Sequence, residues 1–208
     1  KIGVAYVLIF LVSPNSYAQT RSLQTQNLFE NLRKLAKTNV LFGHQDDLAY
    51  GVHWKKERHR SDIKDVCGDY PALFGWEIGH IGQSEFSLDT VWFKDMRKWI
   101  QEAYHLGGVN TISWHLNNPC TGGSSWDNTD CIHDILPGGA YHQIYLEQLE
   151  AVGDFIGSLH TGFLSGQRIP VIFRPFHEHS GGWFWWGKGH TSAEDYKTLY
   201  RFTVDYLR

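Results

Sequence analysis

One stretch of the chain gathers residue types that can cleave glycosidic bonds. Residues 169–189 read IPVIFRPFHEHSGGWFWWGKG, so an apolar run is followed by Arg174, then by His177, Glu178 and His179, and then by four aromatic rings. A carboxyl group can carry protons, a cation and imidazoles can set its charge and orientation, and flat indoles can stack on pyranose rings. We therefore interpret Glu178 as a general acid/base, and the aromatic cluster as ligand contact rather than ordinary core.

The elements that position these residues can be predicted from hydrophobic patterning. Short apolar runs indicate buried strands, and each is followed at its carboxyl end by polar residues. Apolar residues at helical spacing indicate amphipathic helices, and Thr191-x-x-Glu194 resembles a capping box. Strands are expected at residues 40–42, 72–76, 109–114 and 170–173, and helices at 27–37, 90–104, 141–159 and from Thr191 onward.

Strand followed by helix, repeated four times, is typical of a parallel α/β fold with its site at the strand carboxyl ends. A doubly wound sheet satisfies the same alternation, but no Gly-x-Gly-x-x-Gly loop follows the first strand, which argues against a nucleotide-binding version. Polar residues after all four strands favour a (β/α)8 TIM barrel. Such a barrel needs eight units and about 250 residues, so we expect these 208 residues to hold only the first four βα units.

Several motifs together resemble glycoside hydrolase family 26, the β-mannanases. They are Arg-Pro-x-His-Glu at 174–178, Gly-x-Trp-Phe-Trp-Trp-Gly at 181–187, and the segments 42–47, 75–77 and 113–119. The resemblance implies a (β/α)8 barrel and a retaining hydrolase that cleaves β-1,4-mannosidic linkages in mannans, with no cofactor. A β-glucanase or β-1,3-xylanase on the same scaffold, or a non-catalytic carbohydrate-binding protein, remains the alternative.

The resemblance assigns the acid/base role to Glu178, on the fourth strand. Retaining glycosidases need a second carboxyl about 5–5.5 Å away as the nucleophile. In this family the nucleophile is a Glu on the seventh strand, expected beyond Arg208, so the chain alone is expected to lack it and to be inactive. We interpret Asp46, Asp47 and Glu77, which follow earlier strands, as hydrogen-bonding or structural carboxylates.

Five further side chains are candidates for substrate binding. His115 resembles the family's substrate-contacting His after the third strand, and Trp183 resembles its stacking platform. His177 is expected to contact sugar or orient the nucleophile, and Arg174 to lie beside the carboxylate pair. Trp126, in the long loop 119–139, is a weaker candidate because the lengths of such loops vary.

A zinc hydrolase is a rival interpretation, because His177, Glu178 and His179 lie close to His190. The metalloprotease motif His-Glu-x-x-His needs a second His four residues after the first, on one face of a helix. That position is Gly181, in a Gly-Gly pair that disfavours a helix. We therefore expect no metal.

The composition is that of an ordinary globular domain, with 42% hydrophobic and 20% charged residues and a net charge of −3. There is no basic excess to attract nucleic acid. Aromatic residues reach 15%, with nine Trp, which fits a polysaccharide partner.

The first residues resemble a secretory signal peptide. Lys1 precedes the apolar run Ile2–Val12, which is too short to span a bilayer, and Ser16 and Ala18 form a small-x-small cleavage site. Residues 1–18 are therefore expected to be the signal and 19–208 the catalytic part, secreted to the extracellular space or periplasm and not held in a membrane.

Three cysteines fit an oxidising compartment. Cys120 and Cys131 bracket a Gly/Ser/Asn-rich loop and are a possible disulfide. Cys67 would then have a partner outside this chain or be a buried free thiol.

Cleavage is expected between Ala18 and Gln19, because the small-x-small site follows the apolar run directly. N-terminal sequencing of secreted protein should begin at Gln19 or close to it. A mature protein that still carries Ile2–Val12 would contradict the secretion hypothesis.

Overall fold

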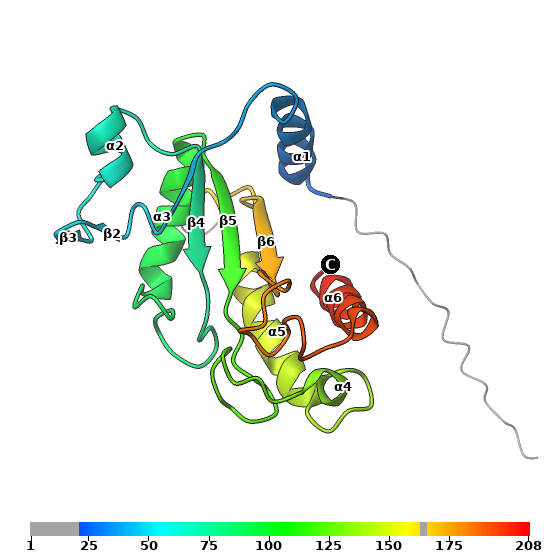
Figure 1. Ribbon diagram of the computed structural model, residues 1–208. Coiled ribbons are helices and arrows are strands. Elements are labelled where there is room, and N and C mark those ends of the chain that lie inside the picture. The colour runs from blue at the N-terminus through cyan, green and yellow to red at the C-terminus, as the bar shows by residue number, and fades with distance from the viewer. Residues whose placement is uncertain (1–20, 163–165) are drawn as a thin grey trace, which may run out of the picture.

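The structure, a computed structural model, describes residues 21–162 and 166–208 (Figure 1). The expected signal peptide, residues 1–18, lies outside this part of the chain. Among the helices described, none has the length and apolar character needed to cross a membrane.

A four-stranded parallel sheet forms the centre of the structure (Figure 1). Its strands, in sheet order, are β1 (Gly43–Gln45), β4 (Leu73–Glu77), β5 (Val109–Trp114) and β6 (Val171–Pro175). Every neighbouring pair is parallel, so all four carboxyl ends lie at the same edge of the sheet. The expected parallel α/β class is therefore confirmed.

Helices connect the strands and cover the sheet. Because consecutive parallel neighbours are joined by right-handed crossovers, the connecting helices α3 and α5 lie on one face. A small hairpin and α2 occupy the segment between β1 and β4. The bounds are α1 (Leu23–Leu35), β2 (Tyr50–Gly51), β3 (Trp54–Lys55), α2 (Asp62–Cys67), α3 (Phe93–His105), α4 (Ile132–Ile135), α5 (His142–Gly157) and α6 (Ala193–Leu207).

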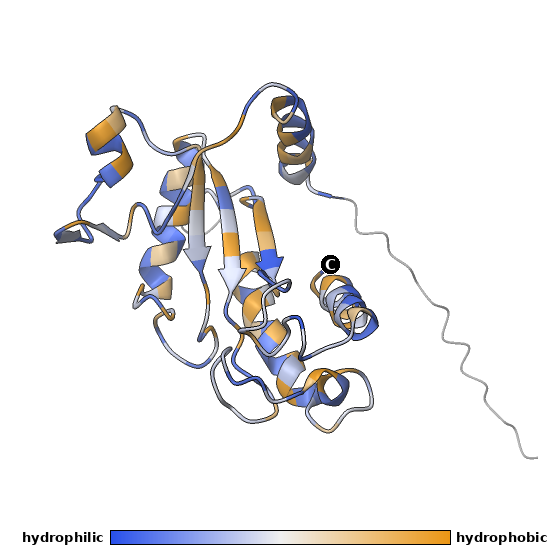
Figure 2. Ribbon diagram, in the orientation of Figure 1, coloured by the Kyte–Doolittle hydropathy of each residue, from blue (hydrophilic) through white to orange (hydrophobic). Residues whose placement is uncertain are grey.

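The core lies between the two central strands and α3 and α5. Figure 2 shows that β6 is hydrophobic along its body and hydrophilic at its tip, where the site begins. One polar link crosses this core. Trp76 Nε1 donates to Asn110 Oδ1 at 2.8 Å, and Asn110 Nδ2 donates to the Ile100 carbonyl oxygen at 3.2 Å, which ties β4 and β5 to α3.

The predictions for the central strands are confirmed, whereas the prediction for the first strand is wrong. Residues 109–114 form β5 as expected, and 72–76 overlap β4 within a residue at each end. Residues 40–42 precede β1, with Val40 97% and Phe42 61% exposed. The reason is that β1 is an edge strand with β4 as its one sheet neighbour, and α1, which buries no residue, stands apart from it (Figure 1).

Two predicted helix starts are also corrected. Helix α1 begins at Leu23, four residues before the expected start, because the Ser22 hydroxyl accepts a hydrogen bond from Thr25 N and caps it. In α6 the cap is Ser192 rather than Thr191, because Ser192 Oγ accepts from Asp195 N at 3.1 Å. Both starts follow the ordinary preference for Ser at the N-cap.

The possible disulfide is present, with the Cα atoms of Cys120 and Cys131 5.8 Å apart. It closes the loop that leads from β5 to α4. Cys67, at the end of α2, is a free and exposed thiol, so the expectation of a buried one is wrong. The short helix α2 leaves the Cys67 side chain in solvent because it buries none of its residues.

Replacing Asn110 with Ala in the full-length protein should lower the free energy of unfolding by about 2–4 kcal/mol, because Trp76 Nε1 is then a buried donor without an acceptor and a small cavity remains. Urea unfolding measures the difference. Asn128→Ala, at an exposed loop position, is the matched control and should stay within about 0.5 kcal/mol of the parent. Equal effects of the two substitutions would contradict a structural role for this link.

Candidate active site

Glu178 follows β6 and lies exposed at the carboxyl edge of the sheet. Its Oε2 accepts a hydrogen bond from Trp183 Nε1 at 3.0 Å, which holds the carboxyl at the N–H edge of the indole. Among the described residues, Trp183 is the one side chain that donates a hydrogen bond to the Glu178 carboxyl.

The backbone around Glu178 is held in an uncommon conformation. Phe176 and Glu178 have φ angles of 50° and 57°, in the left-handed region that non-glycine residues rarely adopt. Each costs about 1–3 kcal/mol and persists only where the surroundings enforce it. Here Tyr196 donates to the Phe176 carbonyl oxygen at 3.1 Å and Trp186 Nε1 to the His177 carbonyl oxygen at 2.9 Å. The two bonds fix the turn that presents the acid/base candidate.

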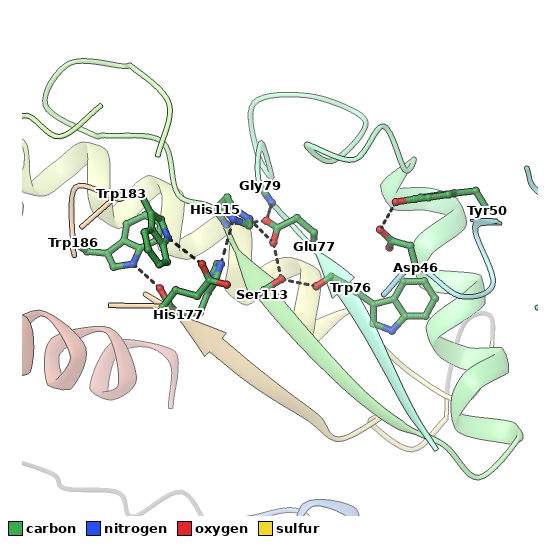
Figure 3. A network of polar contacts seen from close by, with 11 residues as sticks. Asp46, Tyr50, Trp76, Glu77, Gly79, Ser113, His115, His177, Trp183 and Trp186 are labelled. Carbon is green, nitrogen blue, oxygen red and sulfur yellow. Dashed lines mark hydrogen bonds and ion pairs between the residues drawn. The ribbon is translucent and has the colours of Figure 1, made fainter. Parts of the chain in front are cut away.

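Two imidazoles connect this turn to the centre of the sheet (Figure 3). His177 Nε2 lies 3.3 Å from His115 Nε2, and the other ring nitrogen of His115, Nδ1, lies 2.8 Å from Glu77 Oε2. Glu77, His115 and His177 follow three successive strands, β4, β5 and β6. The parallel register therefore aligns a carboxylate and two imidazoles in a row that leads toward Glu178.

Glu77 is the buried end of this row, with 2% of its surface exposed. Oε1 accepts from Gly79 N at 2.6 Å and from His115 N at 2.8 Å, and Oε2 accepts from Ser113 Oγ at 2.6 Å. Together with the His115 ring, three donors and one cation surround the carboxylate. Such a site stabilises the ionised form and is fixed in position by its bonds to both strands.

The three titrating groups have different proton affinities. Burial alone raises the pKa of Glu77, but the hydrogen bonds and charge of His115, together with the Ser113 bond, outweigh it and hold that pKa below its ordinary value. Burial lowers the pKa of His115, yet the bond and charge of Glu77 outweigh it and raise that pKa. Burial and the charge of His115 lower the pKa of His177. His115 therefore holds a proton more readily than His177, and His177 is the neutral imidazole beside Glu178.

Aromatic rings form a wall next to the imidazoles. Phe184 is buried at its centre, with ring centroids 5.2 Å from His115, 5.1 Å from Trp126 and 6.3 Å from Trp183. Trp126 is 62% exposed and Trp183 is 43% exposed, so both indoles are free to stack on a sugar ring. The structure thus brings the loop candidate Trp126 to the same wall as Trp183.

The interpretation of the aromatic cluster as ligand contact is wrong for its last two members. Trp185 and Trp186 are completely buried. Trp185 Nε1 donates to the Leu116 carbonyl oxygen at 3.0 Å, and Trp186 anchors the turn at His177. These two indoles are core that supports the site.

The structure places Arg174 on β6, opposite Ser113, with its residue exposed. Among the described residues it forms no ion pair with a carboxylate. Its positive charge contributes to the lowered pKa of His177.

The residues of the zinc interpretation point to different neighbours. The ring of His179 stacks on Tyr196, with centroids 4.4 Å apart, whereas His177 packs against His115. Across residues 21–162 and 166–208, no group of three or more His, Cys, Asp or Glu side chains is arranged to hold a metal ion.

The carboxylates that follow β1 are structural in form. Asp46 and Asp47 are buried, and Tyr50 donates to Asp46 Oδ2 at 3.5 Å. Burial and the nearby charge of Asp89 raise the pKa of Asp46 to about 7. Sequence reasoning missed Asp89, and also Ser113, which aligns with Glu77 across the sheet. A Ser opposite a strand-terminal Glu is a signal only once the register is known.

Comparison with known proteins agrees with this geometry. The profile of Glycosyl hydrolase family 26 matches residues 14–208, which is most of the chain. The chain belongs to glycosyl hydrolase family 26. The resemblance inferred from the motifs is confirmed.

Relatives within family 26 cover the chain but extend beyond it. A mannan endo-1,4-β-mannosidase of Bifidobacterium adolescentis is 35% identical over 93% of this chain and 19% of its own length. A mannan endo-1,4-β-mannosidase of Bacillus subtilis is 26% identical over 94% of this chain and 54% of its own length. The chain thus spans about half, or less, of the length of these relatives.

Solved structures give the same picture. A family 26 β-mannanase from Bacteroides ovatus superposes with a TM-score of 0.84 at 46% identity, over 89% of this chain and 54% of that one. A double mutant of Cellulomonas fimi endo-β-1,4-mannanase superposes with a TM-score of 0.78 at 34% identity, over 89% of this chain and 42% of that one.

Replacing Glu77 with Gln should destabilise the full-length protein by about 1–3 kcal/mol. The new amide NH₂ takes the place of a carboxylate oxygen that accepts hydrogen bonds, so it points at a group that itself donates. The effect should depend on pH. The pKa of Glu77 is lowered on folding, so its contribution is present above the ordinary 4.5 and is lost as pH falls through the folded value. The pKa of His115 is raised, so its contribution is full below the ordinary 6.5 and is lost as pH rises through the folded value.

The stability difference between parent and Glu77→Gln should therefore be largest between about pH 4.5 and 6.5, as measured by urea unfolding across pH. Glu85→Gln, at an exposed position before α3, is the matched control and should give a flat difference. A flat difference for Glu77→Gln as well would rule out the ion pair with His115.

Proposed function

We propose that the protein is a retaining endo-β-1,4-mannanase in which Glu178 is the general acid/base. The observation that carries the proposal is the position of Glu178, held by Trp183 Nε1 at 3.0 Å beside an aromatic wall. Relatives described as mannan endo-1,4-β-mannosidases, and β-mannanase structures with TM-scores of 0.84 and 0.78, support mannan as the substrate.

Glu178 protonates the leaving glycosidic oxygen in the first step and takes a proton from water in the second. The indoles of Trp126 and Trp183, both exposed, stack on sugar rings on either side of Phe184. His177, neutral and anchored by Trp186, can exchange its Nε2 contact with His115 for one with a sugar hydroxyl. The turn at Glu178 is rigid before substrate arrives, so less conformational entropy is lost on binding.

His115 acts as a polar contact whose orientation is set by Glu77. With Nδ1 directed at Glu77 Oε2, its Nε2 faces His177 and the open side of the site. A buried carboxylate that accepts from Nδ1–H fixes the tautomer and keeps Nε2 in a defined direction, as an acceptor in the neutral ring and a donor in the imidazolium. The proposed substrate contacts are therefore His115, His177, Trp183, Trp126 and, through its charge, Arg174.

The four strands form half of a (β/α)8 barrel in this proposal. Successive strands are sheet neighbours, as in a barrel, and the apolar Val40 and Phe42 beside the outer strand β1 are exposed. An open edge with apolar side chains needs a cover. The second half of the barrel supplies that cover and also the nucleophilic Glu, and we propose that activity requires it.

We also propose that the protein is secreted. The Cys120–Cys131 disulfide supports an oxidising compartment, since such bonds are rare in the cytosol. Mannans are too large to enter a cell intact, which fits an enzyme released to the extracellular space or periplasm.

Glu178→Ala in the full-length protein should lower turnover of mannan by about 10²–10⁴-fold, because the sugar alkoxide leaves poorly without a proton. An aryl mannoside with a good leaving group needs little protonation, so its first step should survive while hydrolysis of the covalent intermediate slows. Stopped-flow absorbance should record a burst of aryl alcohol, and azide should restore turnover.

Glu150→Ala, at an exposed position on α5, is the matched control and should retain the parent's rate on both substrates. Equal loss on mannan and on the aryl mannoside, without a burst or azide rescue, would exclude Glu178 as the acid/base. Parent protein that binds mannan but shows no turnover on either substrate would favour the non-catalytic carbohydrate-binding alternative.

A further inference from the structure

A cavity lies beside the first half of α5. It has a volume of about 420 Å³ and is lined by residues of the loop after β5, the loop after β4 and the start of α5. It shares no lining residue with the site described above. Its lining residues are Gln83, Asn117, Asn118, Pro119, Cys120, Thr121, Gly122, Tyr141, Ile144 and Gln148.

The chemistry of this lining favours a neutral, hydroxyl-rich ligand. It contains the side-chain amides of Gln83, Asn117 and Gln148, a Thr hydroxyl, a Tyr ring and an aliphatic side chain, and no lining residue carries a charge. Amides can both donate to and accept from hydroxyl groups, and a ring offers a face to C–H groups. A cavity of this size also falls within the range of about 300–1,000 Å³ typical of small-ligand sites.

One polar atom of this lining has no partner. Gln148 Oε1 is buried and accepts no hydrogen bond from any described residue. A buried acceptor without a partner is costly, and in a native structure such a group calls for an explanation. Gln148 lines the cavity, so a rotation of its amide would let Oε1 accept a hydrogen bond from a ligand hydroxyl there.

Hydrogen bonds order the walls of the cavity before any ligand binds. Asn118 is buried, and its amide nitrogen donates to the carbonyl oxygens of Asp127 and Thr129 while its Oδ1 accepts from Cys120 N. Asn117 Nδ2 donates to Gln83 Oε1 at 2.9 Å, which joins the two loops across the rim. A cavity whose walls are already ordered loses little entropy when it binds a ligand.

We infer that this cavity is an accessory saccharide-binding site, which holds a neutral sugar unit of the polysaccharide outside the catalytic cleft. The inference rests on the proposed function for the identity of the polymer, mannan, and on the cavity for the site itself. The loop closed by the disulfide carries Trp126 to the aromatic wall and Cys120 to the cavity, so one loop contributes to both sites.

The test is affinity electrophoresis of the full-length protein, with Glu178→Ala in every sample so that the polymer is not cleaved. The gels contain soluble galactomannan, or soluble β-glucan in a parallel set. Gln148→Leu should weaken binding to galactomannan roughly 5- to 10-fold, the effect of losing one neutral hydrogen bond in a dry site. Ile144→Arg, at a 42% exposed position, should weaken it as well by blocking the cavity.

Gln143→Leu is the matched control, because it is the same substitution on the same helix at an exposed position outside the cavity. It should bind as the parent does. Thermal unfolding separates binding from folding: Gln148→Leu removes an unpaired acceptor, so its Tm should equal or exceed that of the parent.

The outcomes decide between the two proposals. If the parent is retarded and both cavity variants match it, or if neither polymer retards the parent, the accessory site is overturned. A lower Tm of Gln148→Leu with unchanged binding would also overturn it and give Oε1 a structural role. Cavity-dependent retardation by β-glucan in place of galactomannan would keep the accessory site and reject mannan as the substrate.

Discussion

The candidate site depends on the way a single carboxylate is buried. Removing an ionised Glu from water costs several kcal/mol unless donors replace the lost hydration. Glu77 receives donors from Gly79, from Ser113 and from both the backbone and the ring of His115. These partners come from β5 and from the turn after β4, so the two strands must be in their observed register for Glu77 to remain charged. The position of the His115 ring, and through it that of His177, follows from that requirement.

A second constraint acts on the turn after β6. Two left-handed residues cost free energy locally, and the bonds from Tyr196 and Trp186 offset this cost from outside the turn. Tyr196 lies on α6, after the turn in the chain, and Trp186 belongs to the core. The acid/base candidate is therefore positioned by residues that do not touch a substrate, and exposure of Glu178 is compatible with a rigid backbone beneath it.

The sequence was sufficient for the central strands and for the family, because buried strands leave long apolar runs and the motif around Glu178 is specific. It was insufficient where contacts with neighbouring elements decide whether a side chain is buried or what it binds. Val40 and Phe42 have the composition of a buried strand but lie beside an edge strand that α1 does not cover. Trp183 and Trp185 are the same residue type two positions apart, yet one is 43% exposed and the other fully buried. The role of Ser113 could not be predicted, because it depends on pairing between strands that are distant in sequence.

The bond between Cys120 and Cys131 has a consequence for when the loop that carries Trp126 becomes ordered. It shortens the loop that carries Trp126, and closing a loop of this length contributes about 3 kcal/mol by restricting the open chain. Before the disulfide forms, that restriction is absent. The Trp126 ring and the cavity wall at Cys120 are then no longer held by the same covalent link. A chain in which both cysteines are reduced therefore carries a looser loop, and oxidation of the pair tightens it.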